Sequence, residues 1–355
     1  MPNRKPTLKS AKKVKFGVII VSHNNINTLK KLLASLESEV ASDDFVVVVD
    51  NHKAHASIPI ANEFKCVNKS ITSENDGFAA ACNVGFELLP VYCTHVLLLN
   101  PDTILQKGTL KNLKSKTTRW SVCMGLLTMN DDKVNSAGNI VHISGLSWCN
   151  GFGDNVKKHT QSKEVFIATG AAMSVDRNVW QSINGIYDEY FLYYEDTDFS
   201  TQIIMTGGKI GLEPSAFIYH DYDYSKSDTK WFYLERNRYI YIIRCWPMPV
   251  ILLLLPYLIC IELGLWLVSI IERRFVLKLR STLSLVKALP KSWASRKNVQ
   301  KNRVISSYDF LQHLEPQVLT LQLGNPNNFK LLNAFSKMYY LFVKNILKLT
   351  AKKVQ

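Results

Sequence analysis

The residues best placed to do chemistry are Asp50 and Asp102, which follow two apolar runs, VVVVDN and LLLNPDT. The carboxylate of Asp50 could accept a hydrogen bond from a pyrimidine N3–H or from a ribose hydroxyl. Asp102 could bind a divalent cation, because Mg²⁺ typically takes one or two protein carboxylates and completes its shell with phosphate oxygens. The alternative for both segments is an ordinary turn, since Asn, Pro and Asp favour turns.

The elements around these residues predict that they meet at one edge of a sheet. FGVIIVSHNN reads as a buried strand that ends at Ser22, and the next segment has leucines at helical spacing, namely Leu29, Leu32, Leu33 and Leu36. A helix over about 78–89 separates the strands that end at Asp50 and near Asp102. This alternation predicts an α/β fold with a doubly wound sheet, in which ligands bind outside the carboxyl ends of the strands.

The second half of this region adds two further polar positions. YFLYYEDTDFS predicts a helix that is entered through Glu195 and Asp196, and AFIYH predicts a short last strand that ends on His220. Asp196 could also be a simple helix N-cap, and His220 could be a buried histidine with no ligand. Asp50 could likewise only close a turn with Asn51.

The positive charge is concentrated in the C-terminal part of the chain. The net charge is +14, yet 21 Lys and Arg against 6 Asp and Glu follow residue 224, so the first 224 residues are close to neutral. These basic residues alternate with long aliphatic runs, which disfavours a nucleic-acid site. We therefore expect a basic tail over 1–15, a catalytic domain over 16–240 and a helical membrane-associating region over 241–355.

Two segments of that last region predict contact with an anionic membrane surface. Residues 247–271 are long enough to span a bilayer, but Pro256 and Glu262 lie inside them and favour a kinked or surface-lying segment. A spanning helix would also place the basic run 273–301 on the side opposite the catalytic domain, against the positive-inside tendency. Residues 330–348 predict a basic amphipathic helix.

Eight ordered blocks resemble family 2 glycosyltransferases, most closely the rhamnosyltransferase-like branch. The blocks are SHNN, VVVVDN, ENDGFAAACNVGF, LLLNPDT, TGAAMSVDRNVW, YDEYFLYYEDTDFS, EPSAFIYH and ERNRYIYIIR. The resemblance covers roughly 16–244 and implies a GT-A fold. It also implies inverting, metal-dependent transfer of a sugar from a nucleoside diphosphate donor.

The resemblance assigns roles residue by residue. Asp196 is similar to the catalytic base, with Glu195 as a structural or acceptor-orienting carboxylate. Asp102 and His220 are similar to ligands of Mg²⁺ or Mn²⁺, and Gly170 and Ala171 are candidates for the acceptor site. The residues expected at the donor are Ser22, Asn24, Asp50, Asn51, Asn75, Asn83, Asn100 and Arg236.

The sequence departs from the family pattern at three places. The usual Asp-Gly-Ser after the DN block is replaced by residues around Lys53, and alanines 79–81 stand where glycines are common. Asn100 occupies the position of the first Asp of a fuller metal motif.

The expected reaction moves rhamnose or a hexose from a dTDP- or UDP-linked donor to a lipid-linked or polysaccharide acceptor, at the cytoplasmic face of the cell membrane. Two alternatives remain open at this level. A sugar nucleotidyltransferase would carry a glycine-rich basic loop near the N-terminus, and residues 22–27 contain neither Gly nor Lys. A noncatalytic membrane scaffold would keep the fold without turnover.

Overall fold

The computed structural model describes residues 13–129, 132–222 and 227–351, so the first twelve residues of the predicted basic tail lie outside it. Its main sheet has the order β10-β12-β6-β11-β4-β1-β2-β3, with β5 paired to β12 and β7 paired to β6. The strands are β1 (Phe16–Ser22), β2 (Phe45–Asp50), β3 (Lys69–Thr72), β4 (His95–Leu99), β5 (Thr103–Leu105), β6 (Val122–Thr128), β7 (Val134–Ser136), β10 (Lys163–Glu164), β11 (Ala172–Asp176) and β12 (Ile210–His220).

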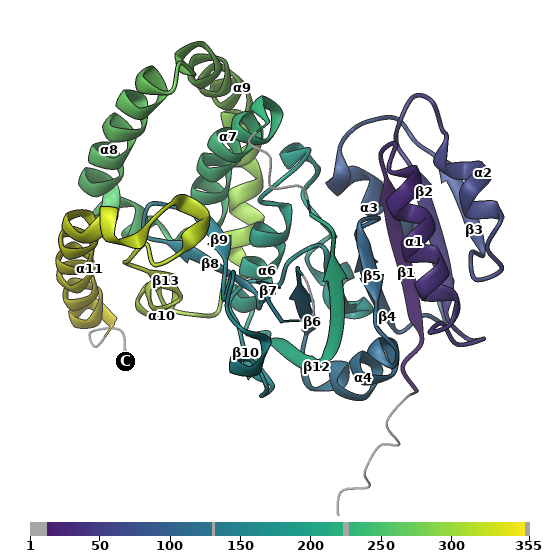
Figure 1. The fold of residues 1–355 in the computed structure, drawn as a ribbon. Coiled ribbons are helices and arrows are strands. Elements are labelled where there is room, and N and C mark those ends of the chain that lie inside the picture. Colours follow the sequence, from purple (N-terminus) through teal and green to yellow (C-terminus); the bar gives the residue numbers. More distant parts are fainter. Residues whose placement is uncertain (1–12, 130–131, 223–226, 352–355) are drawn as a thin grey trace, which may run out of the picture.

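Helices cover both faces of this sheet, as the doubly wound pattern predicts (Figure 1). One face packs on α1 (Ile26–Glu37), α2 (Ser57–Asn62) and α4 (Thr109–Lys116), and the other on α3 (Phe78–Glu87), α5 (Arg177–Ser182) and α6 (Glu195–Met205). Alternate residues of β1 enter the two cores: Val18 and Ile20 belong to one, and Ile19 and Val21 to the other. The predicted α/β class is therefore confirmed.

The sheet is mixed, which corrects the expectation of a simple doubly wound sheet. Strands β3, β2, β1 and β4 run parallel, but β11 is antiparallel to both β4 and β6. The expected short last strand is in fact the end of the eleven-residue β12, whose pairing with β6 shifts register between Glu213 and Phe217. Such an irregularity bends the strand locally.

A second body of structure is built from helices and a small sheet. It contains α7 (Asp228–Cys245), α8 (Met248–Ile271), α9 (Phe275–Lys301), α10 (Ser307–Gln312) and α11 (Lys330–Ala351). Its sheet has the order β13-β8-β9, formed by β13 (Leu314–Glu315), β8 (Asn139–His142) and β9 (Ser147–Cys149). Because β13 pairs with β8, the C-terminal part of the chain returns to the domain that precedes it.

Helix α7 joins the two bodies and runs across residue 240, where we expected the domain boundary. It packs against α9 on one side and contacts α6 on the other. The strongest tie to α6 is buried: Arg244 Nε lies 2.8 Å from Asp198 Oδ2, and Asp198 also accepts a hydrogen bond from Tyr190. Asp198 therefore links the helix that begins with Glu195 to α7.

Helix α8 is one continuous helix across Pro256. Within the described residues it is the one helix long and apolar enough to cross a membrane by length and composition. Glu262, near the middle of α8, is paired with basic side chains of two other helices. The Glu262 carboxylate lies 2.9 Å from Arg238 of α7 and 2.8 Å from Lys278 of α9.

We predict that Arg244→Met lowers the free energy of unfolding by about 3–5 kcal/mol, because it leaves the Asp198 carboxylate buried without its cation. Urea unfolding measures this change. The matched control is Lys209→Met, which removes an exposed pair with Glu164 and costs about 1 kcal/mol or less. Equal losses in the two variants would contradict a stabilising role for the Asp198–Arg244 pair.

Candidate functional site

Asn100, Asp102, Gly170, Asp196 and His220 form what we call the strand-end site. Asn100 follows β4, and its N–H donates to the carbonyl of Ala171 at 2.9 Å. The next residue back along that segment, Gly170, donates its N–H to Asp196 Oδ2 at 3.0 Å. A short chain of contacts therefore connects the end of β4 to the first turn of α6.

Asp102 and His220 meet because β5 and β12 pair in antiparallel register, with His220 opposite Thr103. The main-chain N–H of Asp221 also donates to the carbonyl of Asp102 at 2.9 Å. These bonds bring Asp102 Oδ1 to 3.3 Å from His220 Nε2. The two side chains thus lie side by side at one end of the sheet.

The polar atoms at this place fit a hard divalent cation. Asn100 Oδ1, Asp102 Oδ1 and His220 Nε2 are buried and form no hydrogen bond within the described part of the chain. Buried polar atoms without partners are uncommon in native proteins, and bound ions are one explanation for them. His220 Nδ1 lies 3.2 Å from Asn135 Oδ1, an acceptor, which leaves the Nε2 lone pair for a cation.

The protein supplies few ligands of its own. Among the described residues there is no group of three or more His, Cys, Asp and Glu side chains that could hold a metal. Asp102 and His220 would therefore need further oxygen ligands from a substrate or from water, which is the usual manner of Mg²⁺. No local sequence pattern shows that Asn135 orients His220, because the two residues are 85 positions apart.

Asp196 lies half-buried at the first turn of α6, beside Gly170. Burial raises the pKa of Asp196, and the hydrogen bonds from the Gly170 N–H and from Thr197 oppose that rise. A Cβ at position 170 would lie 3.4 Å from the Cβ of Asp196, so Gly170 leaves only van der Waals room beside the carboxylate. A carboxylate with a raised pKa is a stronger base at neutral pH.

Glu195 is more deeply buried than Asp196, and its Oε2 has no hydrogen-bond partner among the described residues. Burial, and then the charge of Asp196, raise the pKa of Glu195 to about 8. Near neutral pH the Glu195 carboxyl group is therefore largely protonated, whereas a surface carboxylate in an ion pair is ionised.

The segment before Glu195 is held in an unusual conformation. Phe191, Tyr193 and Tyr194 all have positive φ angles, although none of them is glycine. Asn237 of α7 holds this segment, because its amide nitrogen donates to the carbonyls of Tyr190, Leu192 and Tyr193, each at 2.8 Å. No local sequence pattern indicates this role of Asn237, because its partners lie 44 to 47 positions earlier in the chain.

The predicted donor residues divide into two groups in the structure. Asp50 is fully buried, and its two oxygens accept main-chain N–H groups of His52 and Ser57 at 2.9 and 2.8 Å. Asn83 exchanges two hydrogen bonds with the main chain of Ile186. Both side chains therefore hold loops in place, and their contact with a nucleotide stays a prediction.

Four further residues that we expected at the donor differ in how exposed they are. Ser22 is buried against Ser57, while Asn24 and Asn75 are accessible in their loops. Asn51 follows Asp50, and its Oδ1 lies 3.0 Å from His23 Nδ1.

Arg236 donates to the carbonyl of Glu189 and stacks on Tyr233, so the structure places it beside 188–190. Its expected contact with the donor also stays a prediction.

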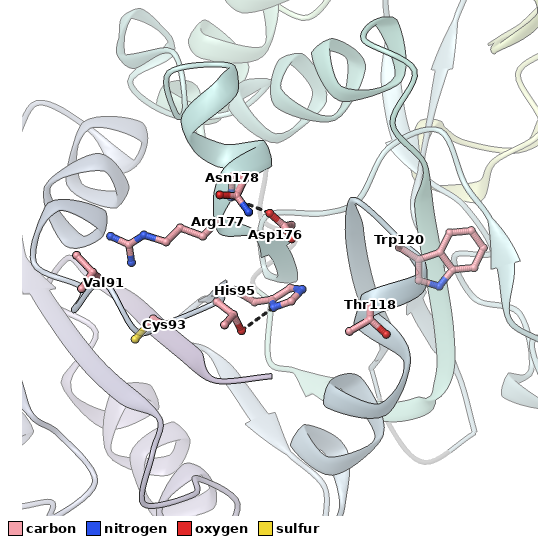
Figure 2. Close-up of a pocket in the computed structure, with 9 residues that line it drawn as sticks. Val91, Cys93, His95, Thr118, Trp120, Asp176, Arg177 and Asn178 are labelled. Carbon is pink, nitrogen blue, oxygen red and sulfur yellow. Dashed lines mark hydrogen bonds between the residues drawn. The ribbon is translucent and has the colours of Figure 1, made fainter. Parts of the chain in front are cut away.

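A separate cavity of about 410 Å³ lies at the opposite ends of the strands (Figure 2). It is lined by His95, the first residue of β4, and by Asp176, the last residue of the antiparallel β11. Asp176 caps α5 through the N–H of Asn178 at 2.7 Å, and Arg177 donates to the carbonyl of Pro90 at 2.9 Å. These polar groups serve the fold, and the cavity is remote from the strand-end site.

The comparisons with known proteins concern the family and the fold. Residues 17–182, a little under half of the chain, match the family model described as glycosyl transferase family 2, so this segment is similar to the domains of that family. This match supports a glycosyltransferase enzyme. The matched segment contains Asn100, Asp102 and Gly170 but ends before Asp196 and His220. The comparison with curated proteins returns no match.

Two solved structures are similar to the chain. One is a crystal structure of GalNAc-T7 with UDP, GalNAc and Mn²⁺, at 15% identity and a TM-score of 0.54, covering 67% of this chain and 49% of that one. The chain thus spans about half the length of that neighbour, and the likeness supports the GT-A-like fold. The other is S. aureus TarS 1–349, at 12% identity and a TM-score of 0.47, covering 96% of this chain and 92% of that one.

We predict that Glu195 makes the free energy of unfolding fall as the pH rises from about 4.5 toward 8, the two values of its pKa in the unfolded and folded chain. In this window the folded chain binds more protons than the unfolded chain, so stability decreases with pH. Glu195→Gln cannot ionise and should flatten this slope in urea unfolding at pH 5, 6.5 and 8. The exposed control Glu87→Gln should keep the pH dependence of the parent's unfolding free energy. If Glu195→Gln also kept it, Glu195 would not be the group with the raised pKa.

Proposed function

We propose that the enzyme transfers a sugar, rhamnose or a hexose, from a dTDP- or UDP-linked donor with inversion at the anomeric carbon. The acceptor is a lipid-linked or polysaccharide glycan of the cell surface, and the enzyme works at the cytoplasmic face of the membrane. The observation that carries the proposal is the strand-end site, where unpartnered cation ligands and a half-buried carboxylate are joined through 170–171.

Each residue of this site has a defined part in the proposed reaction. Asp196 takes the proton from the acceptor hydroxyl as that oxygen attacks the anomeric carbon. Gly170 holds the Asp196 carboxylate by its N–H and keeps the adjacent space free of a side chain. Asp102, His220 and Asn100 would hold Mg²⁺ or Mn²⁺, which when bound neutralises charge on a leaving diphosphate.

The alternative functions make different demands. A scaffold without turnover needs neither a raised pKa at Asp196 nor buried atoms of Asp102 and His220 that form no hydrogen bond, yet both are present. Release of nucleoside diphosphate from a donor without acceptor distinguishes the enzyme from a scaffold. The donors to compare are dTDP-rhamnose, UDP-glucose, UDP-galactose and UDP-N-acetylglucosamine, each with Mn²⁺.

We predict that Asp196→Asn slows this release by roughly 10²-fold or more, because the base is lost, while nucleotide affinity stays within a few-fold. Turnover assays and titration calorimetry measure the two quantities. The control Asp188→Asn alters an exposed carboxylate of the same segment and should leave turnover unchanged. Loss of nucleotide binding together with turnover in Asp196→Asn would make Asp196 a structural residue.

We also predict that Asp102→Asn abolishes the Mn²⁺-dependent thermal stabilisation by UDP or dTDP and leaves the Tm of the nucleotide-free protein nearly unchanged. The reason is that the carboxylate lies at a strand end, where its Oδ1 forms no hydrogen bond with another described residue and its close side-chain contact is His220 Nε2, at 3.3 Å. Asp221→Asn is the matched control, since the main chain of Asp221 bonds to that of Asp102 at 2.9 Å but its carboxylate lies 3.8 Å from Lys31. If EDTA left the stabilisation of the parent protein by UDP or dTDP unchanged, the metal role of Asp102 would be contradicted.

A further inference from the structure

Exposed apolar side chains are concentrated in one part of the molecule. Among the described residues, only three large exposed apolar side chains precede residue 248, namely Val84, Val91 and Tyr92, and 24 follow it. Soluble monomers rarely expose apolar surface in such concentration, and a patch of this kind marks an interaction site. The C-terminal helices therefore carry a surface that is built to be covered.

Three helices each have one packed face and one exposed apolar stripe. Helix α11 packs on the protein through Ser336, Tyr340, Val343 and Leu347, which follow helical spacing. Its exposed stripe is Leu331, Phe335, Met338 and Phe342. The corresponding stripes are Leu252, Leu255, Ile259, Leu263 and Leu267 on α8, and Val276, Leu279, Leu283 and Val286 on α9. Because α8 contacts both α9 and α11, the stripes belong to adjoining helices (Figure 1).

The loop that precedes α11 continues this apolar surface. Leu319, Leu321 and Leu323 are 64%, 64% and 43% exposed, and they alternate with the inward residues Thr320 and Gln322. This alternation turns every leucine of the loop away from the protein, so the loop presents three leucines to its surroundings.

The same loop is fastened beside the strand-end site. Gln322 Oε1 accepts the N–H of Cys149 in β9 at 2.8 Å, and Asn333 of α11 binds both the N–H and the carbonyl of Val318, at 2.7 and 3.1 Å. The next residue, Asn150, exchanges main-chain hydrogen bonds with Ala137 and Gly138 at 2.9 and 2.8 Å, and Asn135 of that same segment contacts His220. The leucine loop is thus tied through β9 to the segment that orients His220.

Charge indicates which partner covers this surface. After residue 247 the sequence has 16 Lys and Arg but only 4 Asp and Glu. One of those acids, Glu262, is already paired with Arg238 and Lys278. A second copy of this chain would bring like charges together, whereas a layer of anionic headgroups gains about 1 kcal/mol for each basic residue near it.

Both ends of α8 are tied to the rest of the molecule. Val250, Leu254 and Tyr257, in its first half, are buried in the core that includes Tyr340 of α11. Just after its last turn, Arg274 lies 3.8 Å from Asp228 at the start of α7. These ties hold α8 to one protein body at its start, middle and end, which favours a helix that lies along one leaflet over one that crosses the bilayer.

We propose that the stripes of α8, α9 and α11, together with Leu319, Leu321 and Leu323, form one surface that inserts into a single anionic leaflet. This arrangement places the strand-end site at the boundary between lipid and water, so its acceptor is a glycan carried on a lipid. The statement about the acceptor rests on the proposed function. The insertion itself stands on the structure alone.

The first test places a bimane label at Leu321→Cys, at Leu263→Cys and, as a control, at Val91→Cys, in a background where the exposed Cys260 is replaced by Ser. Vesicles contain 30% phosphatidylglycerol in phosphatidylcholine, or phosphatidylcholine alone. We expect a blue shift and quenching by brominated lipid at positions 321 and 263 with the anionic vesicles, and no change at position 91. A protein that floats with the vesicles while the label at 321 is unaffected would overturn the insertion of the loop.

The second test compares two triple variants. Leu319→Gln/Leu321→Gln/Leu323→Gln should weaken partition onto the anionic vesicles at least tenfold, and Val84→Gln/Val91→Gln/Tyr92→Gln should leave partition unchanged. Both variants should keep the stabilisation by UDP or dTDP with Mn²⁺, which shows that they are folded. Equal partition of the two variants, or a stable dimer of the parent that buries position 321 without lipid, would overturn the proposal.

A third measurement examines the topology. Arg273→Cys, at the exposed turn between α8 and α9, should react with an impermeant maleimide equally well before and after vesicle binding. Protection of this position by vesicles would show that α8 spans the bilayer. None of these readouts needs turnover, so they can fail while the glycosyltransferase activity stands, and the reverse also holds.

Discussion

The antiparallel pairing of β12 with β5 is the constraint on which the site depends. It sets His220 opposite Thr103 and so brings the imidazole to 3.3 Å from the Asp102 carboxylate, although the two residues are more than a hundred positions apart in the chain. Asn135 then fixes which ring nitrogen faces Asp102. The three buried ligand atoms form no hydrogen bond within the described residues, and a bound cation is one way to satisfy such atoms.

The position of the Asp196 carboxylate, on the other side of the strand-end site, depends on α7. Residues in positive φ cost about 1–3 kcal/mol each, so the segment that carries Phe191, Tyr193 and Tyr194 keeps its shape only because its surroundings hold it. Asn237 does so through three carbonyls, while Glu235 and Arg238 on the same helix join the charges of α8 and α9. The apolar helices and the segment that leads into Asp196 therefore share one support, which is α7.

Much of this arrangement follows from local sequence. Apolar runs that end in polar residues locate the strand ends at Ser22, Asp50 and Asn100, and the acidic entry to α6 locates Asp196. What local patterns could not show is pairing at a distance: the antiparallel β11, the full length of β12 and the partners of Asp50 and Asn83 all depend on residues far away in the chain. For the same reason the predicted boundary at residue 240 falls inside α7, where the sequence has no break in composition.

The central claim is that Asp102 and His220 hold a divalent cation for a nucleoside diphosphate beside Asp196. Crystals soaked with UDP and Mn²⁺ and measured at the manganese absorption edge test it most directly. The account predicts one anomalous peak at about 2.1 Å from both Asp102 Oδ1 and His220 Nε2, with diphosphate oxygens in the remaining positions. Bound UDP with no anomalous peak at these two atoms, or with the metal held elsewhere, would contradict it.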